Sequence, residues 1–468
     1  MQLSAHYRRA ARSFCAPTLL IYCVLLIAIH SASADDVTIA TSRFGNVKIL
    51  RSQGPTEHFV IFLDESAGGE QPADAAKSLT QLGATVAVVE ATRYVEMLSR
   101  DEADCLYLAG EFERLGQVLQ STLKVERYLT PIIAGKGSGA GLAYVIGSES
   151  PQGFRLGVLY DFCPRLAFAE RGLIAGKPFC EETEPQLLKE GDFNLTPSLN
   201  ATTPFLVVNN PSYTGCPTAA LTAFVHKLPG SAIVSDSAAI AARMKEVGTP
   251  RAASGNFLQT KVADLPLIEL SLAKGKPLIL ILSGDGGWAS IDKELGEYLS
   301  QRDNAVVGFD CLKYFWSKKQ PMSAATDLAR VVEYYSKALN PSSITLVGYS
   351  YGAQVLPFIF NRLSSAAAGQ VSTLILLNPG KKTEFEIHFS DWISEDDEDG
   401  VPIKPELDRI GSLPVSCIYG SEEEDSLCRI LSPSQVKIVE LPGGHHFDGD
   451  YSGLAKVILE SAARGEHR

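Results

Sequence analysis

The sequence predicts two tandem α/β domains, each with a mostly parallel β-sheet flanked by helices. Short β-rich runs alternate with amphipathic helical patterns along the 468 residues, which is typical of a parallel sheet. A chain of this length also exceeds one compact core. Finally, the first half repeats the element order of the second half. We therefore expect a duplicated architecture in which the N-terminal copy is degenerate.

The first 34 residues have the layout of a secretory signal peptide. Arg8, Arg9 and Arg12 precede a short apolar run over residues 16–29. A small-residue cleavage site, Ala-Ser-Ala, follows at residues 32–34. An uncleaved anchor is the alternative, but a bilayer span needs about 20 apolar residues, more than this run contains. The pattern predicts cleavage and export.

Composition and charge exclude several classes of function. A hydrophobic content of 45% and a charged content of 21% fit an ordinary globular protein. The formal net charge is −12, and removing the arginine-containing leader makes the chain more acidic. Such a protein is not drawn to nucleic acid or anionic lipid by bulk attraction. A charged substrate is therefore expected to be cationic.

The cysteines predict disulfides, because an exported chain meets an oxidising compartment. Cys417 and Cys428 flank one loop and are the preferred pair. Two of Cys163, Cys180 and Cys216 supply a second bridge, with the pairing undetermined. Seven cysteines follow the leader, so at least one thiol stays free or pairs between chains.

The second half shows the alternation of strands and helices most clearly. Its first apolar run is a buried strand that ends at a Gly-rich turn, and an amphipathic helical pattern follows. The expected strands are residues 278–282, 305–309, 344–347, 374–377, 415–419 and 437–441. The expected helices are residues 292–301, 324–339 and 354–363.

The first half repeats this order at low identity. Residues 58–63 correspond to 278–282, and residues 85–90 to 305–310. Tyr94 falls where Tyr314 falls, and the strand before Gly135 leads into a Gly-rich turn, as the strand before Gly348 does. Several matches in register favour duplication.

A change in pattern marks the boundary between the copies. Pro250, Ser254 and Gly255 interrupt the helical and strand signals between residues 248 and 265. We expect one domain, the degenerate copy, over residues 35–255 and a second domain over residues 256–468.

Residues 348–352, Gly-Tyr-Ser-Tyr-Gly, carry the main chemical signal. A G-x-S-x-G motif between a strand and a helix places the serine on a sharp turn, where it acts as a nucleophile. The motif predicts an α/β-hydrolase-type site with Ser350 as nucleophile. In the first copy, Gly137 occupies this position and Ser138 lies one place along, which predicts a copy without catalysis.

A serine nucleophile needs a base and an orienting acid, which follow it in the chain order Ser, Asp or Glu, His. Asp425 is the preferred acid and Glu423 the alternative, since both follow the strand 415–419. His446 is the preferred base and His445 the alternative, because Gly-x-His-Phe is the commoner form in this fold.

The oxyanion hole is expected from the backbone N–H groups of Tyr351 and Asp285. The Gly-rich turn that contains Asp285 matches neither nucleotide-binding pattern, so we expect no cofactor. The acidic stretch 396–399 is a solvated loop or a rim that attracts a cationic substrate. It lacks the ligand spacing of an EF-hand, and no metal is expected.

Three blocks of the second half resemble the VirJ/AcvB family of bacterial virulence proteins. They are Ser-Gly-Asp-Gly-Gly-Trp at residues 283–288, Gly-Tyr-Ser-Tyr-Gly at 348–352 and Gly-Gly-His-His-Phe-Asp-Gly-Asp at 443–450. The extra N-terminal half is similar to the longer, AcvB-like form. The resemblance implies a periplasmic α/β-hydrolase that cleaves lysyl-phosphatidylglycerol, with links to acid tolerance and DNA transfer to hosts.

The sequence leaves several functions open. The first is a serine esterase acting on an aminoacylated phospholipid at the membrane surface. The second is a non-enzymatic periplasmic accessory factor that binds type IV secretion components, which the vacant nucleophile position of the first copy favours. An esterase, peptidase or thioesterase with another substrate is the third.

Overall fold

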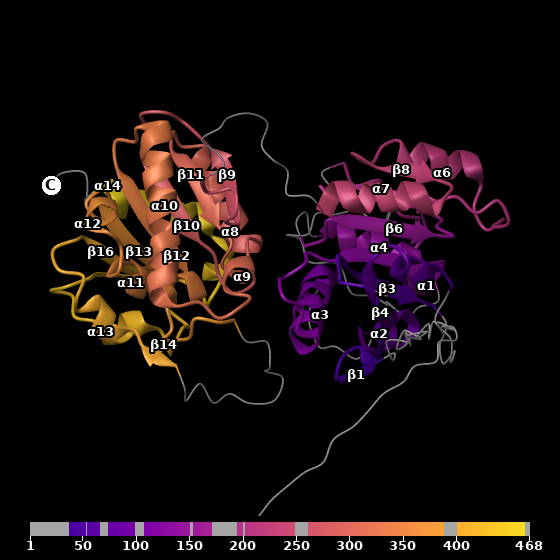
Figure 1. The fold of residues 1–468 in the computed structure, drawn as a ribbon, viewed down its shortest axis with the longest axis horizontal. Coiled ribbons are helices and arrows are strands. Elements are labelled where there is room, and N and C mark those ends of the chain that lie inside the picture. The colour runs from indigo at the N-terminus through magenta and orange to yellow at the C-terminus, as the bar shows by residue number, and fades with distance from the viewer. Residues whose placement is uncertain are drawn as a thin grey trace, which may run out of the picture. The chain divides into compact units, whose positions relative to one another are not determined.

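The computed structural model describes residues 37–52, 54–65, 74–98, 107–149, 153–170, 194–199, 202–248, 261–387 and 400–463. The expected signal peptide, the acidic stretch 396–399 and most of the expected linker lie outside these ranges. Within them, no helix combines the length and apolar character needed to cross a bilayer. Each sheet with its helices is described here as a lobe: the N-terminal lobe (37–248) and the C-terminal lobe (261–463) (Figure 1).

The C-terminal lobe is built on a seven-stranded sheet in the order β17-β16-β13-β12-β10-β11-β9. Every neighbouring pair is parallel except β9 with β11. The strands are β9 Leu267–Ser271, β10 Leu278–Leu282, β11 Ala305–Phe309, β12 Ile344–Tyr349, β13 Thr373–Leu377, β16 Val415–Gly420 and β17 Lys437–Leu441. The main helices are α8 Ser290–Ser300, α9 Cys311–Tyr314, α10 Pro321–Leu339, α11 Tyr351–Phe360 and α14 Tyr451–Ala463.

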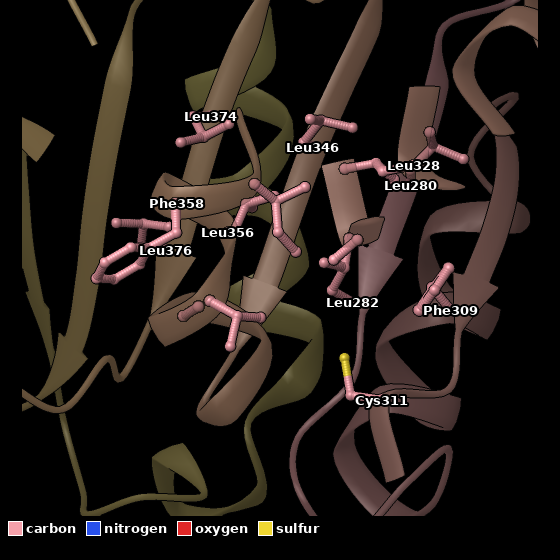
Figure 2. Packing of buried hydrophobic residues seen from close by; sticks show 14 of the residues in the cluster. Leu280, Leu282, Phe309, Cys311, Leu328, Leu346, Leu356, Phe358, Leu374 and Leu376 are labelled. Carbon is pink, nitrogen blue, oxygen red and sulfur yellow. The ribbon is translucent and has the colours of Figure 1, made fainter. Parts of the chain in front are cut away.

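Helices cover both faces of this sheet, which is why its central strands are buried at every position. Successive side chains of a strand point to opposite faces. Leu280, Leu346 and Leu374 lie on neighbouring strands and pack into the cluster that includes α10 and α11 (Figure 2). Ile279 and Ile281 face the other way and pack with residues of α8 and α14.

The N-terminal lobe has an eight-stranded sheet in the order β1-β2-β4-β3-β5-β6-β7-β8. The strands are β1 Val37–Thr41, β2 Gly45–Leu50, β3 His58–Asp64, β4 Ala84–Glu90, β5 Ile132–Lys136, β6 Leu156–Tyr160, β7 Phe205–Val208 and β8 Ala232–Val234. The helices include α1 Asp74–Thr80, α2 Ala91–Leu98, α3 Leu108–Thr122, α4 Ser138–Glu149, α6 Thr218–Val225 and α7 Ser237–Gly248.

The two lobes share one topology, that of the α/β-hydrolase fold. From β2 to β8 the order of the first sheet repeats that of the second sheet from β9 to β17, including one antiparallel strand near the edge. Tyr94 donates to Glu111 at 2.9 Å, and Tyr314 donates to Asp327 at 2.6 Å. Each bond joins the helix after the second parallel strand to the next long helix. The predicted tandem α/β-hydrolase-like fold is confirmed.

The predicted strands of the second half all occur, with ends within two residues of the expected ones. The antiparallel strands β1, β2 and β9 were not predicted. In β9 the burial is only partial, and in β1 it alternates with exposure, so neither strand has the continuous apolar run of a buried parallel strand.

Candidate active site

Ser350 lies on the sharp turn between β12 and α11. Its backbone has φ 49° and ψ −114°, a conformation that costs a non-glycine residue about 1–3 kcal/mol. The flanking glycines are required by close packing. A Cβ on Gly352 would lie 2.3 Å from the carbonyl oxygen of Leu282, and one on Gly348 would lie 2.6 Å from the backbone of Gly352. The motif therefore forms the predicted sharp turn between strand and helix, called here the elbow.

The base beside the nucleophile is His445. Its Nε2 lies 2.9 Å from the Oγ of Ser350. The preferred candidate, His446, was wrong for this position: its Nδ1 lies 3.3 Å from the hydroxyl of Tyr349. The two imidazole planes are 86° apart, because adjacent side chains diverge. Phe447 is buried in the core, which fixes the orientation of the turn.

The carboxylate beside this base belongs to Glu423. Its Oε2 lies 3.2 Å from the Nδ1 of His445. The preferred acid, Asp425, was also wrong, since its side chain is 98% exposed and pairs with Lys381 at 3.0 Å. Ser350, His445 and Glu423 thus form a continuous chain of polar contacts. The His445 side chain is 39% exposed, so solvent and small molecules reach this chain.

Two tied loops explain this choice of residues. The acid loop (residues 421–427) follows β16, and the base loop (residues 442–447) follows β17. The N–H of Glu422 donates to the carbonyl of Gly443 at 3.0 Å, and the N–H of Glu423 donates to Gly420 at 3.0 Å. This turn directs Glu423 toward the base, while Asp425 lies past it.

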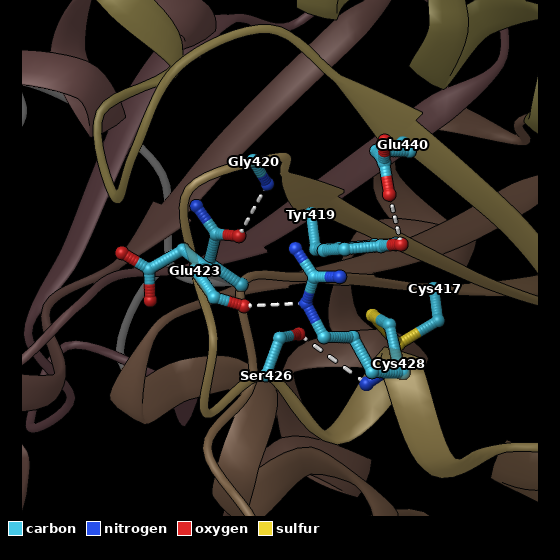
Figure 3. Close-up of a disulfide and its surroundings, with 9 residues drawn as sticks. Cys417, Tyr419, Gly420, Glu423, Ser426, Cys428 and Glu440 are labelled. Atoms are coloured by element: carbon cyan, nitrogen blue, oxygen red, sulfur yellow. Dashed lines mark hydrogen bonds between the residues drawn. A yellow bond between two sulfur atoms is a disulfide. The ribbon is translucent and has the colours of Figure 1, made fainter.

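A disulfide closes the acid loop. Cys417 in β16 is bonded to Cys428, the expected pair, so the loop that carries Glu423 is anchored at both ends (Figure 3). The N-terminal lobe contains a second bridge, between Cys163 and Cys216. Cys180, the third candidate for that bridge, lies outside the described residues.

The Gly-rich turn after β10 lies against the nucleophile. A Cβ on Gly284 would be 3.6 Å from the Cβ of Ser350. Asp285 follows it in the turn and is exposed. Tyr351 is the first residue of α11, so its N–H has no acceptor within the helix. Both expected oxyanion donors therefore lie on segments that adjoin Ser350.

A buried acid in α8, Asp292, lies against the Gly-rich turn. Asp292 is 3% exposed, and its Oδ2 lies 3.5 Å from the N–H of Gly284. Burial raises the pKa of Asp292 well above the usual range, which favours the neutral acid. Burial also raises the pKa of Tyr349. Tyr349 therefore stays a hydrogen-bond donor, 3.3 Å from the carbonyl oxygen of His445.

The N-terminal lobe has the same turn with a glycine in place of the serine. Gly137 has φ 57° at the position of Ser350, and a Cβ on Gly139 would lie 2.3 Å from Leu63 O, as found for Gly352 and Leu282. The N–H of Ser138, which corresponds to that of Tyr351, donates to the Glu65 carboxylate at 3.3 Å. A carboxylate of the chain itself thus occupies the oxyanion side of this turn.

Comparisons with solved structures return α/β-hydrolases at low similarity. Est1E from Butyrivibrio proteoclasticus is 18% identical over 42% of this chain and 93% of that chain, with a TM-score of 0.31. A lipase-esterase related protein from Clostridium acetobutylicum is 17% identical over 42% and 98%, with a TM-score of 0.31. XC6422 from Xanthomonas campestris, a serine hydrolase without lid, is 18% identical over 41% and 84%, with a TM-score of 0.27.

No curated protein sequence matches the chain. A family model, described as bacterial virulence protein (VirJ), matches residues 276–466. The match begins just before β10 and ends after α14, so it spans the elbow, the acid loop and the base loop. Over residues 276–466, the C-terminal lobe of this chain is thus similar to the bacterial virulence protein (VirJ) family.

Proposed function

We propose that the protein is a serine esterase that cleaves the aminoacyl ester of lysyl-phosphatidylglycerol in the periplasm. The observation that carries the proposal is the contact chain of Ser350, His445 and Glu423, with distances of 2.9 and 3.2 Å. A hydroxyl, an imidazole and a carboxylate in this order are the components of a serine-hydrolase triad. The substrate and the compartment come from the family resemblance and from the signal-peptide pattern.

The proposed reaction has two stages. His445 accepts the proton of Ser350 at Nε2 while the oxygen attacks the ester carbonyl. The N–H groups of Tyr351 and Asp285 stabilise the resulting oxyanion. The intermediate collapses to a lysyl ester of the serine, and the protonated base gives its proton to the departing phosphatidylglycerol alcohol. Water then hydrolyses this ester through the same base and releases lysine. Glu423 stabilises the imidazolium in both stages.

The charges around the site suit a cationic acyl group. A lysyl ester carries two ammonium groups, and carboxylates near the nucleophile attract them. Asp285 lies on the Gly-rich turn, and the Glu422 carboxylate packs against Gly444, directly before the base. Both side chains are exposed at the surface. Their position favours an aminoacyl ester over a neutral acyl ester of the same size.

The N-terminal lobe supports a second proposal, a binding role. Gly137 replaces the nucleophile, and the two described histidines of this lobe, His58 and His226, lie at the start of β3 and after α6, away from the elbow. We propose that this lobe, residues 35–255, is a non-catalytic domain. Components of a type IV secretion system are the candidate partners.

The test of the enzymatic function is lysine release from lysyl-phosphatidylglycerol vesicles. The wild-type protein should release lysine, and Ser350→Ala should reduce the rate by about 10⁴-fold or more. His445→Ala should be similarly inactive, whereas the matched variant His446→Ala should stay within about tenfold of wild type. Glu423→Gln should lose more than about 100-fold, and its control Asp425→Asn should lose almost nothing.

Three outcomes would contradict this assignment. Full activity of Ser350→Ala would exclude the serine mechanism. Greater loss with His446→Ala than with His445→Ala would exclude the proposed base. Release of p-nitrophenol from p-nitrophenyl acetate without release of lysine from the vesicles would keep the serine esterase but replace the substrate.

A further inference from the structure

Asn378 occupies an unusual place at the end of β13. It is 2% exposed, and its φ of 45° lies in the left-handed region that few non-glycine residues adopt. Asparagine tolerates this conformation better than most residues. Its backbone N–H donates to the carbonyl of Ile418 at 2.8 Å, and this bond ties its main chain to β16.

The Asn378 side chain joins the two loops that carry the acid and the base. Its Nδ2 donates to the carbonyl oxygen of His445 at 2.8 Å. Its Oδ1 accepts from the N–H of Gly420 at 2.9 Å. Gly420 in turn accepts from the N–H of Glu423. A carboxamide is required here, because it supplies one donor group and one acceptor in the same plane.

The residue before it holds the nucleophile. The carbonyl of Leu377 accepts from the N–H of Ser350 at 2.9 Å. The two-residue segment of Leu377 and Asn378 therefore contacts the elbow and the base loop, and reaches the acid loop through Gly420.

The N-terminal lobe provides a natural comparison. Asp161 follows β6 as Asn378 follows β13, with a φ of 49°. The N–H of Gly137 donates to Tyr160 at 3.0 Å, which repeats the bond of Ser350 to Leu377. The lobe without a nucleophile thus has the same backbone junction but a carboxylate, which has no N–H donor. Asp161 accepts from Asn210 at 2.7 Å and lies 3.7 Å from Lys136, and the amide donor is found in the lobe that contains Ser350.

We propose that Asn378 is a positioning residue that holds the base loop and the acid loop in register with the nucleophile. The inference rests on the proposed serine-esterase function. The side-chain amide of Asn378 restrains the main chain of His445. The base loop therefore keeps the one conformation in which the imidazole of His445 contacts Ser350. Errors of about 1 Å in such positioning cost on the order of 100-fold in rate.

The test compares Asn378→Asp, which keeps the size and one acceptor, with Asp161→Asn as the matched control in the other lobe. We expect Asn378→Asp to melt below wild type, because its buried carboxylate would face the carbonyl oxygen of His445, so the kinetic comparison is made at a temperature at which both proteins are folded. Its kcat for p-nitrophenyl acetate should fall by about 10- to 100-fold with KM within twofold, and labelling of Ser350 by a fluorophosphonate should slow by the same factor. Asp161→Asn should change neither quantity.

A second measurement does not depend on turnover. The ring ¹⁵N and ¹H resonances of His445 report its hydrogen bond to Ser350, and Asn378→Asp should shift them while Asp161→Asn does not. If wild type neither hydrolyses esters nor reacts with the fluorophosphonate, the serine-esterase function is wrong, and these resonances still decide the positioning role. Unchanged kcat together with unchanged resonances would overturn it.

A variant that fits the backbone covers the case in which Asn378→Asp does not fold. Asn378→Gly removes both side-chain bonds and adopts a positive φ without strain. A folded Asn378→Gly protein should show the same loss of kcat. Wild-type kcat in that protein would refute the proposal.

Discussion

Ser350 has a backbone conformation that glycine adopts more easily than any other residue, and this gives a prediction about stability. Ser350→Ala and Ser350→Gly both remove the hydroxyl. The loss of its hydrogen bond to His445 therefore does not contribute to the difference in stability between the two variants. Only the alanine variant keeps a Cβ at φ 49°. The strain amounts to about 1–3 kcal/mol. The extra freedom of glycine in the unfolded chain offsets about 0.5–1 kcal/mol of that.

The glycine variant should therefore be more stable than the alanine variant by about 1–2 kcal/mol. At an ordinary helical position the sign is the opposite, because glycine is less stable than alanine by about 1 kcal/mol. The assay is urea unfolding of both proteins, followed by tryptophan fluorescence and circular dichroism, with the free energy of unfolding extrapolated to water.

The N-terminal lobe supplies the reciprocal control. Gly137→Ala introduces a Cβ at φ 57° and should destabilise that lobe by a similar amount. A Ser350→Gly protein that is less stable than Ser350→Ala would refute the argument. It would mean that the elbow is not strained, or that the strain is released by local movement.

Three further predictions concern groups outside the triad. Burial raises the pKa of Glu149 from 4.5 to about 8, so its contribution to stability is present below pH 4.5 and is lost as the pH rises through 8. In urea unfolding, Glu149→Gln should therefore have the stability of wild type at pH 4.5. At pH 9 it should be more stable than wild type by about 2–4 kcal/mol. Equal stability of the two proteins at pH 9 would contradict a buried charge on Glu149. Burial lowers the pKa of His58 to about 4, so wild type should lose stability between pH 6.5 and 4, and a His58→Gln protein should show a flatter pH dependence over that interval. Cys428→Ser opens the ring around the acid loop and should cost about 2–3 kcal/mol and lower kcat, whereas an unchanged kcat would show that the loop keeps its shape without the bond.

The sequence was sufficient for the fold and for the turn that carries Ser350, because both signals are local. The strand 344–347 and the motif around Ser350 are contiguous, and the elbow geometry follows from its own glycines. The common plan of the lobes was also predictable, since both halves show the same succession of apolar runs and helical patterns. The edge strand β9 was not, because its half-buried residues show no such run.

The choice of acid and base depends on contacts between distant segments. Whether His445 or His446 faces the nucleophile is set by the turn at Gly443, which has φ 87°, and by the burial of Phe447. The choice of Glu423 depends on a loop that is tied to the base loop and closed by a disulfide. Neither constraint can be derived from residue spacing.

The Glu65 carboxylate at the elbow of the N-terminal lobe has a consequence for evolution. Restoring a serine at Gly137 would place its hydroxyl beside a carboxylate, where an anionic intermediate is repelled. Reactivation would require that Glu65 be removed. It would also require that a serine, a histidine and an orienting acid be introduced. Each of these changes alone gives no activity, so selection has no single step to favour. If the N-terminal copy is non-catalytic, as proposed, its surface is free to change while its core is preserved.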